Sequence, residues 1–219
     1  GARADLERAG VTVAGAVGPG AATGICVILV APDGERTMLP DRGANDRLDP
    51  DLVVAALDDR RPAWLHLSGY TLLDEGSRPA GLAALERARA LGVPMSVDAS
   101  SAGPLRHVGA ATFLGWIEGI RLLFANDDEV AAVGGLDVAR PHVEVVVAKH
   151  GPRGVSWVAG DATATVPAVP TTVVDTVGAG DALDAGVIGA VLAGATPEAA
   201  LRAGTVLAAR AVARPGARP

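Results

Sequence analysis

The stretch Val174–Leu183, which reads VDTVGAGDAL, decides the interpretation of this chain. Two glycines bracket an alanine, an aspartate stands on each side, and the stretch contains no lysine. A helix is predicted over 178–192, and the first turn of a helix has unpaired N–H groups and the positive end of the helix dipole. Small residues let an anion approach these N–H groups closely, so the stretch predicts an anion-binding turn with Asp181 inside it.

Other interpretations of this turn can be compared by spacing. The plainest is a helix start at which Asp181 only interacts with the dipole. A Walker A loop needs Gly-Lys-Ser/Thr, and a dinucleotide-binding fingerprint needs a third glycine where Leu183 stands. A carboxylate inside an anion site is instead expected where an alcohol attacks a γ-phosphoryl group, because that reaction needs both N–H donors and a base.

The segment Asp175–Asp181, DTVGAGD, resembles the D-T-x-G-A-G-D signature of the ribokinase-like (pfkB) carbohydrate kinases. The resemblance implies an α/β ribokinase-like fold and an ATP-dependent kinase. It implies that Asp181 is the catalytic base and contacts the substrate, and that Thr176 belongs to the nucleotide site. The implied anion hole consists of Gly178, Ala179 and Gly180.

Two further segments are similar to elements of this family. Asn126-Asp127-Asp128-Glu129 resembles its N-x-x-E motif, which implies that Asn126 and Glu129 organise Mg²⁺, mostly through water; an N-capped helix start is the alternative. Lys149-His150-Gly151-Pro152-Arg153-Gly154 is similar to its strand-end G-x-x-G loop. That similarity implies nucleotide contacts by Lys149, Gly151 and Gly154, against the alternative of a solvated strand end.

Three weaker similarities complete the implied site. Asp98 is the residue that survives where many relatives have D-P-N-x-R, and it is assigned to the substrate. Asp175 and the tail 213–217 resemble the parts that hold a monovalent cation, K⁺, in ribokinase relatives. Arg42-Gly43-Ala44-Asn45 also looks like a family element, although a polar turn would explain it equally well.

Composition excludes several other classes of protein. Hydrophobic residues make up 49% of the 219 and charged residues 20%, which is ordinary globular composition. The net charge of −6, with Lys149 as the only lysine, argues against nucleic acid as a partner. A single cysteine fits a reducing, cytoplasmic location. No apolar run approaches the roughly 20 residues of a membrane span.

The order of predicted elements gives the architecture. Gly24–Val30 and 35–39 are expected to form a β-hairpin around the turn Pro32-Asp33-Gly34. From Asp49 onward strands alternate with helices, which predicts a doubly wound, mostly parallel sheet with helices on both faces. Residues 1–10 are expected to end a truncated N-terminal helix, 11–45 to form a β lid, and 46–219 to form the nucleotide-binding and catalytic domain.

The sequence therefore predicts an ATP-dependent kinase for a hydroxyl of a sugar or sugar-like molecule. A nucleoside kinase of the same fold, and a non-catalytic remnant that binds nucleotide or sugar, are the alternatives. The sugar-recognition motifs that family members carry near the N-terminus do not occur here, so the chain is expected to lack that segment. The β lid is expected to close over the substrate and to offer a homodimer contact. The four histidines are expected to be structural.

Overall fold

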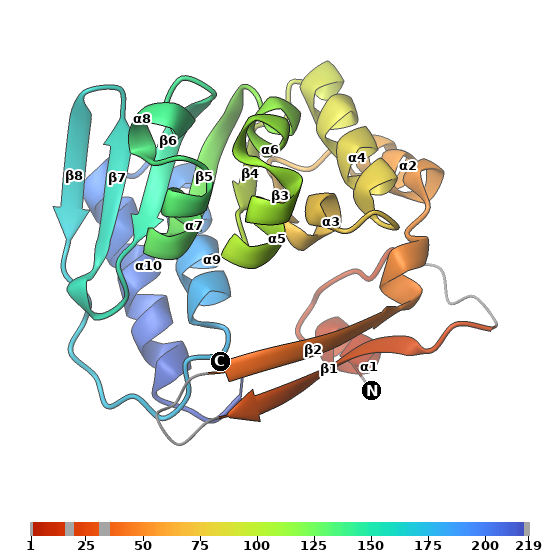
Figure 1. Ribbon diagram of the computed structural model, residues 1–219, viewed down its shortest axis with the longest axis horizontal. Coiled ribbons are helices and arrows are strands. Elements are labelled where there is room, and N and C mark those ends of the chain that lie inside the picture. The colour runs from red at the N-terminus through yellow and green to blue at the C-terminus, as the bar shows by residue number, and fades with distance from the viewer. Residues whose placement is uncertain (1, 16–19, 31–35, 217–219) are drawn as a thin grey trace.

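The computed structural model describes residues 2–15, 20–30 and 36–216. Within them the chain forms a six-stranded sheet with helices on both faces, and a separate two-stranded sheet near the N-terminus (Figure 1). This is the α/β class that the sequence predicts. None of the helices in these ranges is both long and apolar enough to cross a membrane.

The six strands of the main sheet are paired in the order in which they occur in the chain. The first four are parallel, and the last two run antiparallel to their neighbours. The strands are β3 (Leu65–Ser68), β4 (Met95–Asp98), β5 (Ile120–Asn126), β6 (Val143–Lys149), β7 (Val155–Ala159) and β8 (Ala162–Val166). β6 is buried along most of its length, as its apolar, β-branched sequence predicts.

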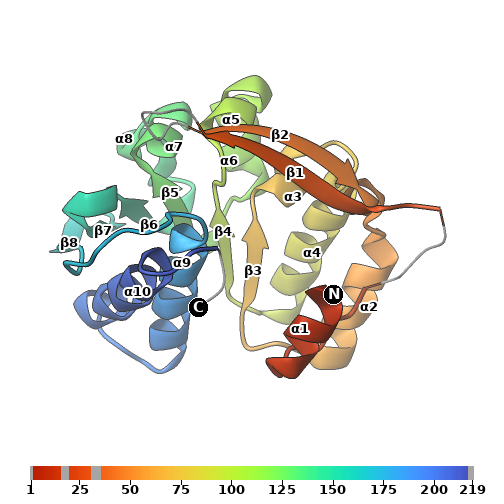
Figure 2. The same cartoon turned by 90° about the horizontal axis from the view of Figure 1, so that it is seen from below.

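The helices that connect the parallel strands cover one face of this sheet. Because parallel crossovers are right-handed, strands added successively in one direction place their connecting helices on the same side. The helices of this side are α3 (Tyr70–Leu73), α4 (Arg78–Leu91), α5 (Ala102–Val108), α6 (Ala110–Trp116), α7 (Asp127–Ala132) and α8 (Leu136–Ala139). The opposite face is covered by α9 (Ala179–Leu192) and α10 (Pro197–Val212), as Figure 2 shows.

Each face of the sheet contributes to its own hydrophobic core. Consecutive side chains of β5 alternate between the two, because neighbouring residues of a strand point to opposite faces. Leu123 packs with the helices α4 to α8, whereas Phe124 packs with Leu183 and Val187 of α9. Burial of each such side chain contributes about 1.5–3 kcal/mol, so the apolar face of α9 fixes this helix on the sheet.

Glycines bring α9 and α10 into backbone contact. A Cβ added to Gly186 of α9 would lie 2.7 Å from the Cα of Gly204 in α10. A Cβ added to Gly204 would lie 2.8 Å from the backbone oxygen of Leu183. No side chain fits between the two helices at this crossing.

The N-terminal part consists of α1 (Ala2–Arg8), β1 (Thr23–Val30), β2 (Arg36–Gly43), the 3-10 helix η1 (Ala44–Arg47) and α2 (Pro50–Arg60). β1 and β2 pair antiparallel and lie at the end of the molecule toward which β3 points (Figure 2). An ion pair between Arg42 and Asp74 joins β2 to the segment after α3. A Cβ on Gly76 would lie 2.7 Å from the backbone oxygen of Asp46, so the two segments touch there as well.

Some elements differ from those expected. The helix that the sequence predicts over 111–117 corresponds to α6, and the structure adds a second short helix, α5, which Gly109 with φ 90° separates from α6. The antiparallel strands β7 and β8 and the four-residue helices α3 and α8 are additional. The expected turn Pro32-Asp33-Gly34 lies outside the described residues. The division of the chain at 10 and 45 stays a prediction.

Candidate active site

The start of α9 has the features of an anion site. Gly178 precedes the helix in the left-handed conformation, with φ 80°, and no side chain caps the helix. Among the described residues, no hydrogen bond is made by the N–H groups of Gly180 and Asp181. The side chain of Asp181 is exposed in the same turn. N–H donors and a carboxylate therefore occupy one helix end, as the sequence predicts.

Asp175 holds the loop that leads into this turn. Its carboxylate accepts hydrogen bonds from the N–H of Val177 at 2.9 Å and from the N–H of Gly216 at 3.0 Å. The backbone N–H of Val174 also donates to the oxygen of Val212 at 2.7 Å. These bonds place the loop beside the end of α10, where the resemblance puts a monovalent cation. Thr176 lies between them and is exposed.

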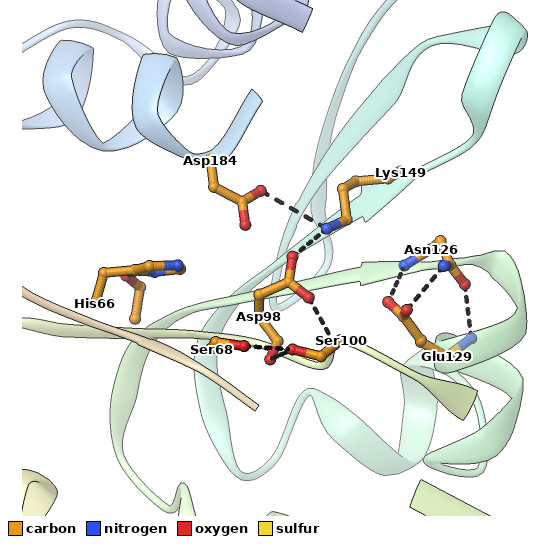
Figure 3. A network of polar contacts seen from close by, with 9 residues as sticks. His66, Ser68, Asp98, Ser100, Asn126, Glu129, Lys149 and Asp184 are labelled. Carbon is orange, nitrogen blue, oxygen red and sulfur yellow. Dashed lines mark hydrogen bonds and ion pairs between the residues drawn. The ribbon is translucent and has the colours of Figure 1, made fainter. Parts of the chain in front are cut away.

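Lys149 brings a positive charge to the start of α9. It ends β6, and its ammonium forms an ion pair with Asp98 at the end of β4 and lies 3.7 Å from Oδ1 of Asp184 in α9 (Figure 3). A Cβ added to Gly180 would lie 3.4 Å from this ammonium. Lys149 is thus next to the predicted anion hole and not at a solvated strand end.

Burial and mutual contact shift the pKa values of Lys149, Asp98 and Asp184. Burial alone would lower the pKa of Lys149, but the carboxylates of Asp184 and Asp98 outweigh it, so the pKa is raised. Burial alone would raise the pKa of Asp98, but Lys149 and hydrogen bonds outweigh it and lower the pKa. For Asp184 burial wins, and its pKa is raised well above its ordinary value despite Lys149. These shifts favour the ionised forms of Asp98 and Lys149 and the protonated form of Asp184.

Asp98 is engaged within the protein. One carboxylate oxygen accepts from the N–H of Ser100 at 2.6 Å and the other from Lys149, and the residue is 9% exposed. Its assignment to the substrate is a prediction that this geometry does not favour, because both oxygens already have partners. Its clear contact is with Lys149.

Asn126 and Glu129 form a reciprocal capping box at the start of α7. The amide oxygen of Asn126 accepts from the N–H of Glu129 at 2.9 Å, and the carboxylate of Glu129 accepts from the N–H of Asn126 at 2.8 Å (Figure 3). Burial raises the pKa of Glu129, which is 4% exposed, although the bond from Asn126 opposes it. The structure thus contains the helix cap that the sequence left as the alternative.

This capping box can still hold Mg²⁺ through water. Each carboxylate oxygen of Glu129 accepts one hydrogen bond, from the backbone or side-chain nitrogen of Asn126, which leaves a second lone pair on each. In residues 2–15, 20–30 and 36–216 no three His, Cys, Asp or Glu side chains converge into a complete metal site. Mg²⁺ usually binds through one or two carboxylates, waters and substrate phosphates, so such a cluster is not required.

The strand-end loop after Lys149 is fixed to α7. His150 Nδ1 lies 2.6 Å from the carboxylate of Asp127, and the guanidinium of Arg153 lies 2.5 Å from its other oxygen. Gly151 and Gly154 have φ values of 57° and 108°, which favour glycine. A Cβ on Gly154 would also lie 2.1 Å from the oxygen of Val166. The loop therefore requires its glycines for conformation, while their nucleotide contacts stay predictions.

His66, for which the sequence predicts a structural role, lies close enough to the site for the charges of Asp98, Lys149 and Asp181 to act on it. Ser96 Oγ accepts a hydrogen bond from Trp64 Nε1 at 2.8 Å and lies 2.8 Å from His66 Nδ1. Ser96 is fully buried, and its hydroxyl has no other acceptor among the described residues, so we assign its O–H to donate to Nδ1. The ring then carries its proton on Nε2.

Burial lowers the pKa of His66, with the charges of Asp98, Lys149 and Asp181 also acting on it. Above this lowered pKa the imidazole is neutral. Its Nε2–H can then donate a hydrogen bond on the face of the sheet that α9 covers. The sequence does not reveal this arrangement, because His66 lies on β3 and its partner Ser96 lies on the neighbouring strand β4. Sequence reasoning also missed Asp184, whose position three residues after Asp181 is a signal that the helix prediction offered.

Comparison with known proteins gives an independent view. The pfkB family carbohydrate kinase model matches residues 1–219. An ATP-dependent ribose-1-phosphate kinase of Halopiger xanaduensis is 32% identical over 228 residues, covering 99% of this chain and 71% of that protein.

Solved structures give the same result for the fold. The adenosine kinase of Sinorhizobium meliloti has a TM-score of 0.76 at 25% identity, over 90% of this chain and 62% of that one. An E. coli protein described as a ribokinase II, solved with ATP and Mg²⁺, has a TM-score of 0.75 at 21% identity, over 91% and 67%. The chain thus spans about two thirds of the length of these structures.

Proposed function

Because this chain belongs to the pfkB family of carbohydrate kinases, we propose that it transfers the γ-phosphoryl group of ATP to a hydroxyl of a sugar or sugar-like substrate. The observation that carries the proposal is the first turn of α9. It presents unpaired N–H groups, the exposed carboxylate of Asp181 and the ammonium of Lys149 at one place.

The proposed reaction assigns each of these groups a role. Asp181 accepts the proton of the substrate hydroxyl as the substrate oxygen bonds to the γ-phosphorus. The bond from that phosphorus to the bridging oxygen breaks, and ADP leaves. The unpaired amides of Gly180 and Asp181 donate to the transferring phosphoryl oxygens, where charge is highest in the transition state; the N–H of Ala179 donates to the oxygen of Thr176 at 3.3 Å. Lys149 adds a full positive charge beside Gly180.

Mg²⁺ would be held through water by Asn126 and Glu129. The ion would neutralise negative charge on the nucleotide phosphates. The carboxylate of the buried Glu129 would bind the ion through water. K⁺ beside Asp175 is a further proposal, supported by the loop that Asp175 fixes next to the end of α10. The glycines of 151–154 and Thr176 would line the nucleotide.

A nucleoside kinase is the second candidate. The similarity to the adenosine kinase of Sinorhizobium meliloti favours it, because at 25% identity that protein shares the family fold over most of this chain. Both candidates use the same phosphoryl-transfer groups and differ in the substrate hydroxyl. A binding protein without activity is the third candidate, and the presence of Asp181 argues against it.

A lid and dimer role is proposed for β1 and β2. Within the described ranges the sheet of β1 and β2 pairs with no further strand. Its apolar side chains are 50–63% exposed at Ile25, Val27, Leu29 and Leu39. Exposed apolar strands of this kind pair readily with a second copy. Sedimentation of the chain and of an Ile25→Lys variant would test the dimer: the variant should shift toward monomer, and an unshifted distribution would contradict the proposal.

The decisive experiment measures ADP release with ATP, Mg²⁺ and a panel of acceptors. The panel contains ribose, ribose 1-phosphate, fructose, 2-keto-3-deoxygluconate and adenosine. Asp181→Asn is the test variant, and Asp161→Asn, a fully exposed carboxylate between β7 and β8, is the matched control. We expect Asp181→Asn to lower kcat by about 10²–10⁴-fold while the control is unchanged. Binding of ATP without turnover of any acceptor, or an active Asp181→Asn variant, would refute the proposed mechanism.

A further inference from the structure

Lys149 is the only lysine in the chain, and it is held inside the protein. Its side chain is 14% exposed, and its ammonium lies against the Cα of Gly180, where an added Cβ would be 3.4 Å away. The N–H groups of Gly180 and Asp181 are unpaired at the same helix end. A phosphoryl group bound by those amides would therefore be next to this ammonium.

Two carboxyl groups from different elements hold this ammonium in place. Asp98 approaches from β4 and forms the shorter ion pair, while Asp184 approaches from α9 with Oδ1 at 3.7 Å (Figure 3). A lysine ammonium sits at the end of a flexible four-carbon chain, so the side chain by itself does not hold it in one position. Contact from two sides restricts it in a way that Asp98 alone could not.

Asp184 is unusual for a buried carboxyl group. It is 1% exposed, and no described N–H or O–H group donates a hydrogen bond to its two oxygens. Besides Lys149 it interacts with the carboxylate of Asp98, to which it can donate when it is protonated. A buried, unsatisfied polar group of this kind costs roughly 1–3 kcal/mol, and an apolar side chain would fit the helix–sheet contact without that cost. Among the residues that the structure describes, Lys149 is the cation that forms an ion pair with it. Its presence therefore indicates a role that acts on the lysine.

The charges around this group agree with such a role. Asp181 on the same helix, Asp98 on β4 and Lys149 on β6 act on Asp184, and Glu129 also acts on Lys149. Burial and the neighbouring carboxylates raise the pKa of Asp184 well above its ordinary value, which favours the protonated form. In that form Asp184 contacts the ammonium without adding a second negative charge beside the phosphate site.

We propose that Asp184 is a positioning residue for phosphoryl transfer: with Asp98 it fixes the ammonium of Lys149 at the start of α9, where the ammonium contacts the transferred phosphoryl group. This inference rests on the proposed kinase function. It adds Asp184, which lies outside the glycine turn, to the residues of the proposed site. It also has Lys149 contact the terminal phosphoryl group instead of acting as part of the strand-end loop 149–154.

A double-mutant cycle on nucleotide binding tests whether Asp184 acts through Lys149. Binding of the non-hydrolysable analogue AMP-PNP with Mg²⁺ is measured by calorimetry for Asp184→Leu, Lys149→Met and the double variant. Leu fills the site of Asp184 without polar atoms, and Asp161→Asn is the control. Each single change should weaken binding about tenfold, which is typical for loss of a hydrogen bond to a charged group, and the double change no more than either one. An effect of Asp184→Leu below twofold, or a double effect near 100-fold, would overturn the proposal.

The second test does not depend on catalysis. Because the chain has one lysine, acetylation of its peptide by acetic anhydride, followed by mass spectrometry, reports on that amine alone. The rate at pH 8 should rise several-fold in Asp184→Leu, and bound AMP-PNP should slow it in the wild type. Equal rates in the two proteins, or binding without protection, would overturn the proposal. If the wild type binds no nucleotide, the kinase function fails, while the rate comparison still decides whether Asp184 holds Lys149.

Discussion

Substitution of Gly186 by alanine tests how the position of α9 depends on its contact with α10. The added Cβ would lie 2.7 Å from the Cα of Gly204, 2.8 Å from the oxygen of Ala203 and 2.9 Å from the N of Gly204. All three atoms belong to backbone, which cannot rotate away. Carbon atoms pack at about 3.5–4.0 Å, so the helices would have to separate by roughly 1 Å.

Two opposing effects set the magnitude. Alanine is favoured over glycine inside a helix by about 1 kcal/mol. Insertion of a methyl group into a close-packed contact costs about 1–3 kcal/mol or more, and a backbone-to-backbone contact belongs at the upper end. We therefore expect Gly186→Ala to lower the free energy of unfolding by about 2 kcal/mol, or the Tm by about 4–8 °C for a chain of this size.

The same helix supplies the control. Gly189 is exposed, and a Cβ added there would meet nothing within 4 Å. Gly189→Ala should keep only the propensity gain and raise the Tm by about 2–4 °C. Thermal and urea denaturation of both variants give the comparison, and kcat gives a second readout. Since a misplacement of about 1 Å at a catalytic group can cost about 100-fold, Gly186→Ala should also lower kcat while Gly189→Ala leaves it unchanged. A Gly186→Ala protein as stable as Gly189→Ala would refute the close contact.

Three further predictions follow from contacts elsewhere in the molecule. Asn126→Ala removes the side-chain acceptor for the N–H of Glu129 and should cost about 1 kcal/mol in thermal denaturation; an unchanged Tm would contradict the capping box. Because the pKa of His66 is lower in the folded chain than its ordinary value of 6.5, the unfolded chain takes up the proton first, and stability should fall as pH drops below about 6.5. His66→Gln should flatten this dependence in urea titrations at pH 7.5 and 5.5, and an equally steep dependence would assign it to other groups. Asp74→Asn should weaken the ion pair with Arg42 and speed proteolysis of β1 and β2, whereas unchanged digestion would mean that the remaining contacts suffice.

Much of the fold could be predicted from local sequence. The apolar, β-branched run 145–148, preceded by Val143 and Glu144, is recognisable as a buried strand, and Pro197–Val212 has the length and composition of a helix. The family, the fold class and the class of enzyme inferred from DTVGAGD are confirmed by the comparisons. These features rest on interactions within one segment or on a specific motif, which a single sequence displays.

Other elements depend on information that one sequence does not display. α3 and α8 have four residues each, too few for a helical period to be visible. The strands β7 and β8 could have been predicted, because two segments of alternating polar and apolar residues on either side of Gly160-Asp161 are typical of a β-hairpin.

In the site, the sequence indicated the helix start and its aspartate but not what surrounds them. The start of α9 was predicted because its groups are adjacent in sequence. Asp98, Lys149 and Asp184 come from three elements that are brought together only because β4 pairs with β5, β5 pairs with β6, and α9 packs on the sheet. The partners of a buried charge are set by tertiary structure. The helical spacing from Asp181 could have indicated that Asp184 lies near the site, but its contact with Lys149 could not be predicted from the sequence.

The pairing of every strand with its neighbour in sequence has a consequence for synthesis on the ribosome. As each strand of the main sheet emerges, its partner has already been made, so the sheet can grow from β3 to β8 without waiting for distant segments. Its α9-facing side, with Phe124 and Val147, stays uncovered until residues 179–212 leave the exit tunnel. The nascent chain should therefore depend most on chaperones until α9 and α10 have emerged, and the turn at the start of α9 can join Lys149 only then.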